Sequence, residues 1–286
     1  MNPLSPPGLR PAPVLSVVVP VHDEADNVGP LAEEIHAALE GRTDFEIVYV
    51  DDASGDDTPR RLRALAQRYP RLRVLRHLTN AGQSTALLTG VRHARGQLVA
   101  TLDGDGQNDP ADIPSLLARW QDEQEAAASA GPLLLAGWRA SRRDTWLRRL
   151  SSRVANGVRR RVLGDGTPDT GCGLKLFRRD DFLALPHFDH LHRFLPALFI
   201  RHGGRVVSVP VNHRPRLRGQ SHYGVGNRLF VGIVDMAGVL WLRRRTRLTE
   251  VEEIGRSDVG PAASAAAASP PPAYQESKAW TTSPSG

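Results

Sequence analysis

The stretch Val99-Ala-Thr-Leu-Asp103-Gly-Asp105-Gly-Gln107-Asn-Asp109-Pro110 joins an apolar run to an acidic, glycine-lined turn. The run from Leu98 to Leu102 is rich in β-forming residues and predicts a buried strand. Mg²⁺ and Mn²⁺ prefer oxygen ligands and are commonly held by one or two carboxylates together with substrate phosphates. Asp103, Asp105 and the amide oxygen of Gln107 therefore form a candidate half-site for one of these ions, which a diphosphate would complete.

Two alternatives compete with a magnesium or manganese half-site. A calcium loop of the EF-hand type that began at Asp103 would require Gly at its sixth position and Glu at its twelfth. The chain has Asn108 and Pro114 there, which excludes an EF-hand. The other alternative is a solvated Asp/Gly turn that binds no ligand.

Strands and helices alternate along the first half of the chain. Apolar, β-branched runs predict strands, and each is followed by a segment with apolar residues at helical spacing. This order favours parallel strands with right-handed crossovers, and so predicts a doubly wound, mostly parallel α/β sheet. The expected strands are Leu15–Pro20, Phe45–Val50, Leu72–Leu75 and Leu98–Leu102, with two more at Leu133–Ala136 and Val206–Val211. The first expected helix follows the stretch Val21–Asn27, in which an Asp or Asn is expected to cap it, and has Leu31, Ile35, Ala38 and Leu39 on one face. The other expected helices are Pro59–Tyr69, Ser84–Arg95 and Ile113–Trp120.

Acidic residues follow three of these strands. Glu24 comes after the first, Asp52 after the second, and Asp103 with Asp105 after the fourth. Ligands of doubly wound sheets bind beyond the carboxyl ends of the strands, so we expect these acids to converge on one edge. The chain contains neither G-x-G-x-x-G after the first strand nor a phosphate loop. A bound nucleotide would therefore rely on carboxylates for its base and ribose, and on a metal for its diphosphate.

The chain of 286 residues has a net charge of +6, and arginine supplies almost all of its basic side chains. Lys175 and Lys278 are the only lysines. Because arginine suits bidentate capture of phosphate, we expect an anionic partner such as a nucleotide, a phospholipid or a nucleic acid. The single cysteine, Cys172, excludes an internal disulfide and a multi-cysteine zinc site, which fits a reducing cytoplasm.

The ends of the chain differ in composition from its middle. Residues 1–13 are rich in proline and predict a flexible N-terminus rather than a signal peptide. Residues 249–286 are rich in Ala, Ser and Pro and predict a disordered tail. The longest apolar window, Leu229 to Leu242, is too short for a transmembrane helix and contains Asp235. One catalytic domain is therefore expected over residues 14–245.

Four motifs in order on these elements resemble the family 2 glycosyltransferases of the GT-A fold. They are Val-Val-Val-Pro20-Val-His-Asp-Glu24, Val50-Asp-Asp52-Ala-Ser-Gly-Asp-Asp-Thr58, Asn80-Ala-Gly82-Gln and Leu102-Asp103-Gly-Asp105-Gly-Gln107-Asn-Asp-Pro110. Within that family the chain looks most like the dolichyl- and polyprenyl-phosphate sugar transferases. The resemblance implies a Rossmann-like GT-A fold with C-terminal interfacial helices. It also implies an inverting enzyme, dependent on Mg²⁺ or Mn²⁺, that moves a sugar from GDP-mannose or a UDP-sugar to a polyprenyl or dolichyl phosphate.

The resemblance also implies a role for each matching residue. The metal ligands correspond to Asp105 and Gln107. The acceptor phosphate corresponds to Arg139, Arg148, Ser152 and Ser221, and the catalytic positions are Asp103, Asp105, Arg139 and Arg216. The nucleotide-sugar contacts correspond to Pro20, His22, Glu24, Val50, Asp52, Asp103, Gly104, Asp169 and Arg216. His22 departs from a frequent tyrosine, and His222 replaces the usual lysine of a loop expected to close over the diphosphate.

Two segments are predicted to contact a membrane surface. Trp146, Leu147, Leu150, Val154 and Val158 recur at helical spacing with arginines on their flanks, which predicts a basic amphipathic helix. An ordinary core-facing helix with a solvated basic side is the alternative. The window Leu229–Leu242, followed by Arg243-Arg-Arg245, predicts a second interfacial helix. The expected location is peripheral, on the inner face of the cytoplasmic membrane, with a membrane protein as a further partner.

A phosphate acceptor is already largely ionised at neutral pH, so its attack on a sugar requires no general base. Two rival functions are kept open. The first is sugar transfer to a polysaccharide or small-molecule hydroxyl, which requires an acidic base beside the site. The second is a non-catalytic basic module that binds membranes or nucleic acid. Nucleic acid is not expected as a partner, because the acidic strand ends would repel its phosphates and no aromatic stacking platform is visible.

Overall fold

A computed structural model describes residues 13–126, 131–139, 163–215 and 227–245 of the chain. Nearly all of the expected flexible N-terminus and the whole expected tail lie outside these ranges. The predicted basic helix, with Arg148 and Ser152, lies outside them as well. So does most of the predicted closing loop, with Arg216 and Ser221.

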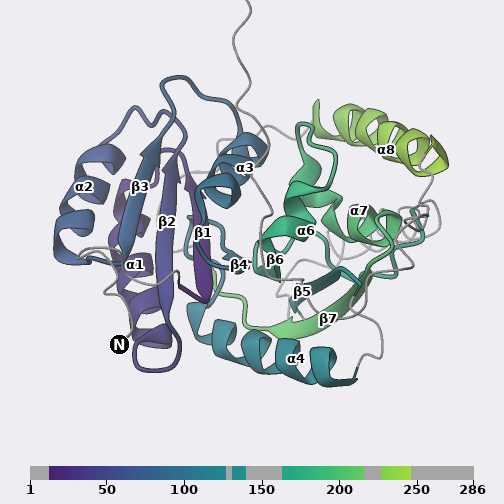
Figure 1. Cartoon of the computed structure of the whole chain (residues 1–286). Coiled ribbons are helices and arrows are strands. Elements are labelled where there is room, and N and C mark those ends of the chain that lie inside the picture. The colour runs from purple at the N-terminus through teal and green to yellow at the C-terminus, as the bar shows by residue number, and fades with distance from the viewer. Residues whose placement is uncertain (1–12, 127–130, 140–162, 216–226, 246–286) are drawn as a thin grey trace, which may run out of the picture. The chain divides into compact units, whose positions relative to one another are not determined.

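Within the described ranges, the strands form one sheet of seven in the order β3-β2-β1-β4-β6-β5-β7 (Figure 1). Four strands of the first half run parallel, and Val17 of the first pairs with Ile47 on one side and Ala100 on the other. Their bounds match the apolar runs of the sequence to within one residue, so the predicted parallel sheet is confirmed. These strands are β1 (Leu15–Val21), β2 (Phe45–Asp51), β3 (Leu72–Arg76) and β4 (Leu98–Thr101).

The second half of the sheet contains the one topological feature that the sequence did not predict. β5 (Leu133–Arg139) and β7 (Arg205–Val211) were expected and pair parallel to each other. Between β4 and β5 lies β6 (Lys175–Arg178), which runs antiparallel to both neighbours. A strand of four residues inside a glycine-rich segment carries too short a pattern to predict a strand.

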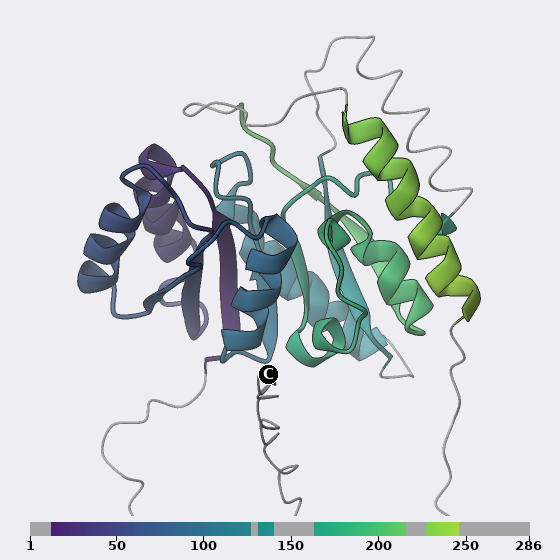
Figure 2. The ribbon, with the colours of Figure 1, turned by 90° about the horizontal axis from the view of Figure 1, so that it is seen from above.

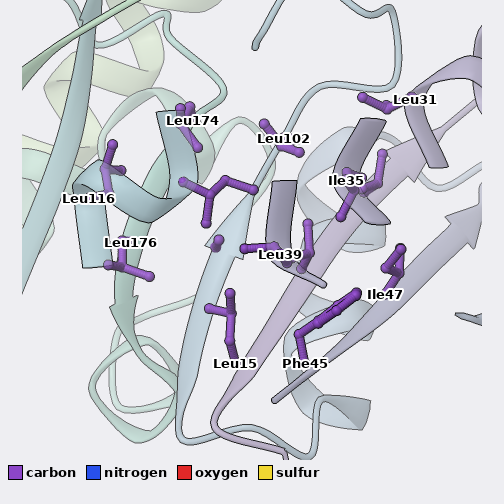
Figure 3. Close-up of a cluster of buried hydrophobic side chains, with 14 of the residues drawn as sticks. Leu15, Leu31, Ile35, Leu39, Phe45, Ile47, Leu102, Leu116, Leu174 and Leu176 are labelled. Atoms are coloured by element: carbon purple, nitrogen blue, oxygen red, sulfur yellow. The ribbon is translucent and has the colours of Figure 1, made fainter. Parts of the chain in front are cut away.

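Three helices cover one face of the sheet. They are α1 (Ala25–Leu39), α2 (Thr58–Arg68) and α4 (Ile113–Ala126), the last preceded by the 3₁₀ turn η1 (Pro110–Asp112). Leu31, Ile35 and Leu39 of α1 belong to one buried cluster with Leu15 and Ile47 of the sheet (Figure 3). Burying such side chains contributes about 1.5 to 3 kcal/mol each, so this cluster holds α1 firmly against the strands.

The opposite face is covered by α3 (Gln83–His93), α6 (Arg179–Leu183), α7 (Leu195–Arg201) and α8 (Asn227–Arg245). Phe177 of β6 stacks on Phe182 of α6 with ring centres 5.1 Å apart. The helix predicted over Leu229–Leu242 is confirmed as α8, which lies beside α7 (Figure 2), and Arg201 Nε donates to the Leu242 carbonyl. Among the described helices, none has the length and apolar character needed to cross a membrane.

The close approach of α3 to the sheet depends on Gly90. A Cβ built at Gly90 would lie 2.3 Å from Val18 Cγ1 and 3.1 Å from Val50 Cγ2, both fully buried. The helix therefore packs its backbone directly onto β1 and β2. This packing sets the position of the N-terminus of α3, which borders the site described below.

Replacing Gly90 by Ala should lower the free energy of unfolding by about 1 to 3 kcal/mol, because the added methyl overpacks the α3 interface. Gly238 of α8 is the matched control, since it is exposed within a helix and a Cβ there meets no atom within 4 Å. Gly238→Ala should leave stability unchanged or raise it by up to about 1 kcal/mol through helix propensity. Urea denaturation of both variants measures the difference. A Gly90→Ala protein as stable as Gly238→Ala would contradict this packing.

Candidate active site

A cavity of about 430 Å³ opens at the carboxyl ends of β1, β2 and β4 and at the start of β6. The predicted convergence of the acidic residues is therefore observed at this edge. Val50, by contrast, is fully buried in the core and does not line the cavity. The predicted residues that do line it are Pro20, His22, Glu24, Asp52, Asp103, Gly104, Asp105 and Gln107.

The loops after β1 and β2 brace each other. The backbone N–H of Asp23 donates to Ser54 Oγ over 3.0 Å, and that of Glu24 donates to Thr58 Oγ1 over 2.9 Å. In return Asp23 Oδ1 accepts from the Gly55 N–H at 2.8 Å. The expected Asp or Asn cap of α1 is wrong, because Glu24 occupies the N-cap without a side-chain cap bond. Asp23 is used to join the two loops instead.

The Asp52 carboxylate is held by three donors. Its Oδ1 accepts from the Ala81 N–H at 2.9 Å and lies 2.6 Å from His77 Nδ1, and its Oδ2 accepts from the Gly82 N–H at 2.8 Å. Gly82 has a φ of +85°, a backbone conformation that glycine adopts without strain. Asp52 is only 3% exposed, so these bonds form away from bulk water. The carboxylate thus fixes the turn that leads into α3, and one lone pair of Oδ2 remains for a ligand.

His22 lies in the same wall of the cavity. Its Nδ1 is 2.9 Å from the Asp52 carbonyl oxygen and 3.2 Å from Asn80 Nδ2. The ring is therefore held between the ends of β1 and β2 and the turn before α3. This position agrees with the predicted contact to a nucleotide base, which stays a prediction.

The turn after β4 brings the two aspartates together. Burial, and then the negative charge of Asp105, raise the pKa of Asp103 to about 6. Gln83 Nε2 donates to Asp103 Oδ1 over 2.9 Å, and the Gln107 N–H donates to Asp105 Oδ1 over 3.1 Å. A Cβ at Gly173 would lie 2.3 Å from the Asp103 carboxyl carbon, so glycine there makes room for this side chain.

This donor set suits a hard divalent cation. The repulsion between Asp103 and Asp105 is the kind of charge conflict that a cation relieves, and no residue of the described ranges donates to Asp105 Oδ2. No cluster of three or more His, Cys, Asp and Glu side chains that could hold a metal occurs in the described part of the chain. An ion here would therefore rest on the two carboxylates, the Gln107 amide oxygen and substrate oxygens, as the sequence predicted for a half-site.

Arg139 is engaged within the protein. Its Nε and Nη2 donate to the two oxygens of Asp169 over 2.6 Å and 2.9 Å, which makes a bidentate ion pair beside the cavity. The sequence predicted that Arg139 grips the acceptor phosphate and that Asp169 orients the sugar. In the structure neither lines the cavity, and the two side chains are paired with each other. A role for Arg139 toward phosphate therefore requires this pair to open or to share the guanidinium.

The start of the predicted closing loop is anchored at the aspartate turn. The Arg214 N–H donates to the Gln107 carbonyl over 3.0 Å, and Arg214 forms ion pairs with Glu34 and Asp109. Arg216 follows two residues later, outside the described residues, and the predicted acceptor residues Arg148, Ser152 and Ser221 lie outside them too. Their roles stay predictions.

Sequence reasoning gave no role to several side chains of the site. His77 holds Asp52, and Gln83 holds Asp103. Lys175, His192 and Arg193 line the β6 side of the cavity. Gln83 belongs to a quoted motif and could have been found there, and Lys175 stands out as a rare lysine in an arginine-rich chain. His192 and Arg193 carry no comparable signal.

Comparison with known sequences identifies the class of protein. The sequence pattern of glycosyl transferase family 2 matches residues 16–185, and the chain belongs to this family. Dodecaprenyl-phosphate galacturonate synthase of Rhizobium johnstonii is 36% identical over 235 residues, which cover 80% of this chain and 67% of that protein. Undecaprenyl-phosphate 4-deoxy-4-formamido-L-arabinose transferase of Edwardsiella ictaluri is 37% identical over 214 residues, covering 74% and 63%. The chain thus spans about two thirds of the length of these relatives.

Solved structures confirm the expected GT-A fold. Glucosyl-3-phosphoglycerate synthase from Mycobacterium tuberculosis, in complex with UDP, has a TM-score of 0.57 at 20% identity, over 81% of this chain and 80% of that chain. A mannosyltransferase from Pyrobaculum calidifontis, in complex with GDP-Man and Mn²⁺, has a TM-score of 0.55 at 22% identity, over 80% and 70%. The family expected from the sequence motifs is confirmed together with the fold.

Replacing Asp52 by Asn should lower the free energy of unfolding by about 2 kcal/mol. The carboxylate accepts hydrogen bonds on both oxygens, whereas the amide of Asn would turn an N–H toward one of the buried donors and leave that donor without an acceptor. Asp57 lies on the same loop with an exposed ion pair to Arg60, so Asp57→Asn should have a far smaller effect. Urea denaturation compares the two variants. Equal stability would show that Asp52 does not hold the turn before α3.

Proposed function

We propose that this protein is an inverting glycosyltransferase that moves a sugar from a nucleoside-diphosphate sugar to a polyprenyl phosphate. The donor would carry GDP or UDP, and the reaction would depend on Mg²⁺ or Mn²⁺. Two relatives at 36% and 37% identity bear the names of polyprenyl-phosphate sugar transferases, although they move different sugars. These relatives support the acceptor class and leave the sugar open.

The distribution of acids in the cavity carries the proposal. Its carboxylates, among the described residues, are Glu24, Asp52, Asp103 and Asp105, all at the ends of β1, β2 and β4. All four are assigned below to the donor and its cation, Asp103 with its raised pKa among them, which leaves His192 on the β6 side as the candidate base. Burial lowers the pKa of His192 to about 3. So weak a base does little to remove a hydroxyl proton. An acceptor that arrives ionised, such as a phosphomonoester, fits this arrangement better than an alcohol.

The residues at the strand ends would each bind a different part of the donor. His22, Glu24 and Asp52 would hold the nucleoside, and Asp103 would border its diphosphate and sugar. Asp105 and Gln107 would hold the cation, which supplies charge neutralisation for the leaving diphosphate when bound. Alignment of the acceptor phosphate behind the anomeric carbon then supplies much of the rate enhancement.

We further propose that the protein acts at the inner face of the cytoplasmic membrane. In the described part of α8, Val234 and Trp241 are 53% and 60% exposed and lie seven residues apart, on one face of the helix. Arg244 and Arg245 at the end of the helix are exposed as well. Apolar side chains next to arginines favour an anionic lipid surface. Arg148, Ser152 and Ser221 would bind the lipid phosphate there, and a membrane protein partner stays a proposal.

Replacing Asp105 by Ala should reduce sugar transfer by about 10³-fold or more, because one metal ligand is lost. The variant should unfold at the wild-type temperature but lose the stabilisation that Mn²⁺ with UDP or GDP confers on the wild type. Asp122→Ala, on the exposed side of α4, is the matched control and should behave as wild type. Full transfer by the Asp105→Ala protein would refute the assignment.

The acceptor class is tested with farnesyl phosphate and farnesol as matched acceptors. We expect a labelled donor to yield lipid-linked sugar with farnesyl phosphate only, because the four carboxylates of the cavity are assigned to the donor and its cation and His192 is a weak base. Product with farnesol at a comparable rate would favour a hydroxyl acceptor. Absence of product together with no thermal response to Mn²⁺ and nucleotide would favour a non-catalytic module.

A further inference from the structure

Arg193 ends the 3₁₀ turn η2 (Leu191–Arg193) and lines the cavity on its β6 side. The side chain is half-buried, and no carboxylate of the described residues forms an ion pair with it. Several other half-buried arginines are paired with a carboxylate, as Arg139 is with Asp169, Arg73 with Glu46 and Arg214 with Asp109, and Arg201 donates to a backbone carbonyl. An unpaired guanidinium in a cavity wall costs solvation energy that an anionic ligand would restore.

The turn that carries Arg193 is fixed from two directions. His192 Nδ1 lies 2.7 Å from Ser84 Oγ in the first turn of α3, and His190 Nδ1 lies 3.0 Å from Asp235 Oδ2 of α8. Leu195, directly after the turn, is fully buried. Arg193 therefore projects from a rigid support, which reduces the entropy lost when it binds a ligand.

The groups around Arg193 are neutral or cationic. His192 is uncharged at neutral pH, because burial lowers the pKa of its ring. Lys175 lines the same side of the cavity. Its Nζ donates to the Cys172 carbonyl, and burial lowers its pKa. Asp189, the acid nearest along the chain, contacts the backbone N–H and the ring of His190. Among the described residues, the β6 side thus presents the charge of Arg193, whereas the ends of β1, β2 and β4 present acids.

We propose that Arg193 is an oxyanion-binding residue of the substrate cavity. This inference rests on the proposed function and deepens it by naming the ligand chemistry on the β6 side. Two sources supply such an oxyanion: the carboxylate of an acidic donor sugar, or the phosphate of the lipid acceptor. A guanidinium binds either in a bidentate geometry.

Binding measurements on the full chain test this assignment without requiring turnover. The probes are UDP, GDP, UDP-glucose, UDP-glucuronate, GDP-mannose, GDP-mannuronate and farnesyl phosphate, each with Mn²⁺. The variants are Arg193→Gln, Arg193→Lys and, as the control with the same charge change, Arg63→Gln on the exposed side of α2. Melting temperatures of the unliganded variants establish that each is folded.

A sugar carboxylate as the ligand predicts that Arg193→Gln weakens binding of the uronate donors by about 10- to 100-fold and leaves the neutral donors unchanged. An acceptor phosphate predicts the same loss for farnesyl phosphate and none for any donor. In either case Arg193→Lys should recover part of the affinity, because it keeps the charge but not the bidentate fork.

Three results would overturn the assignment. The first is affinities of Arg193→Gln that equal those of Arg63→Gln for every probe. The second is a loss of affinity for UDP and GDP as large as the loss for any other probe, which would mean that Arg193 binds the donor diphosphate. The third is a wild-type protein that binds none of the probes. A parallel assay of lipid-linked sugar reports on the proposed function separately, since binding can be altered whether or not product forms.

Discussion

The site depends on the buried carboxylate of Asp52. By accepting from the Ala81 and Gly82 N–H groups and lying against His77, it ties the end of β2 to the start of α3. The N-terminal turn of α3 then supplies Gln83 to Asp103 and Ser84 to His192, so both sides of the cavity are positioned from this one helix end. Gly90 lets the same helix lie directly on β1 and β2. Asp52 thus joins the end of β2 to α3 and is also a candidate contact for a ligand.

The two sides of the cavity differ in charge, because different strands border each side. Acids collect where β1, β2 and β4 end, which suits hydrogen-bond donors of a nucleoside and a divalent cation. The β6 side carries the guanidinium of Arg193, which suits an anionic group. The acidic side would bind the nucleoside and, through the cation, its diphosphate, and Arg193 would bind an anionic group of the sugar or of the acceptor. In that arrangement the opposed charges would orient the substrates as well as attract them.

The first half of the fold was predictable from the sequence because its strands are continuous β-branched runs and its acids follow them directly. The partners of those acids were not predictable. His77 and Gln83 act through contacts across the sheet, and the Arg139–Asp169 pair joins residues thirty positions apart without any periodic pattern. β6 was missed for the same reason, because tertiary pairing with β4 and β5 rather than its own four residues makes it a strand. The helix predicted around Arg148 and the loop predicted around Arg216 fall outside the described residues and stay predictions.

The reversed direction of β6 has a consequence for the order in which this protein assembles. An antiparallel strand brings its beginning to the edge where its neighbours end, so Gly173 and Lys175 reach Thr101 and Asp103 although more than seventy residues separate them. During synthesis the parallel half of the sheet, from β1 to β4, emerges first and is joined by short crossovers. The cavity closes only when the later strand docks. We therefore expect a nascent chain to become competent for catalysis only after nearly all of the sheet has formed.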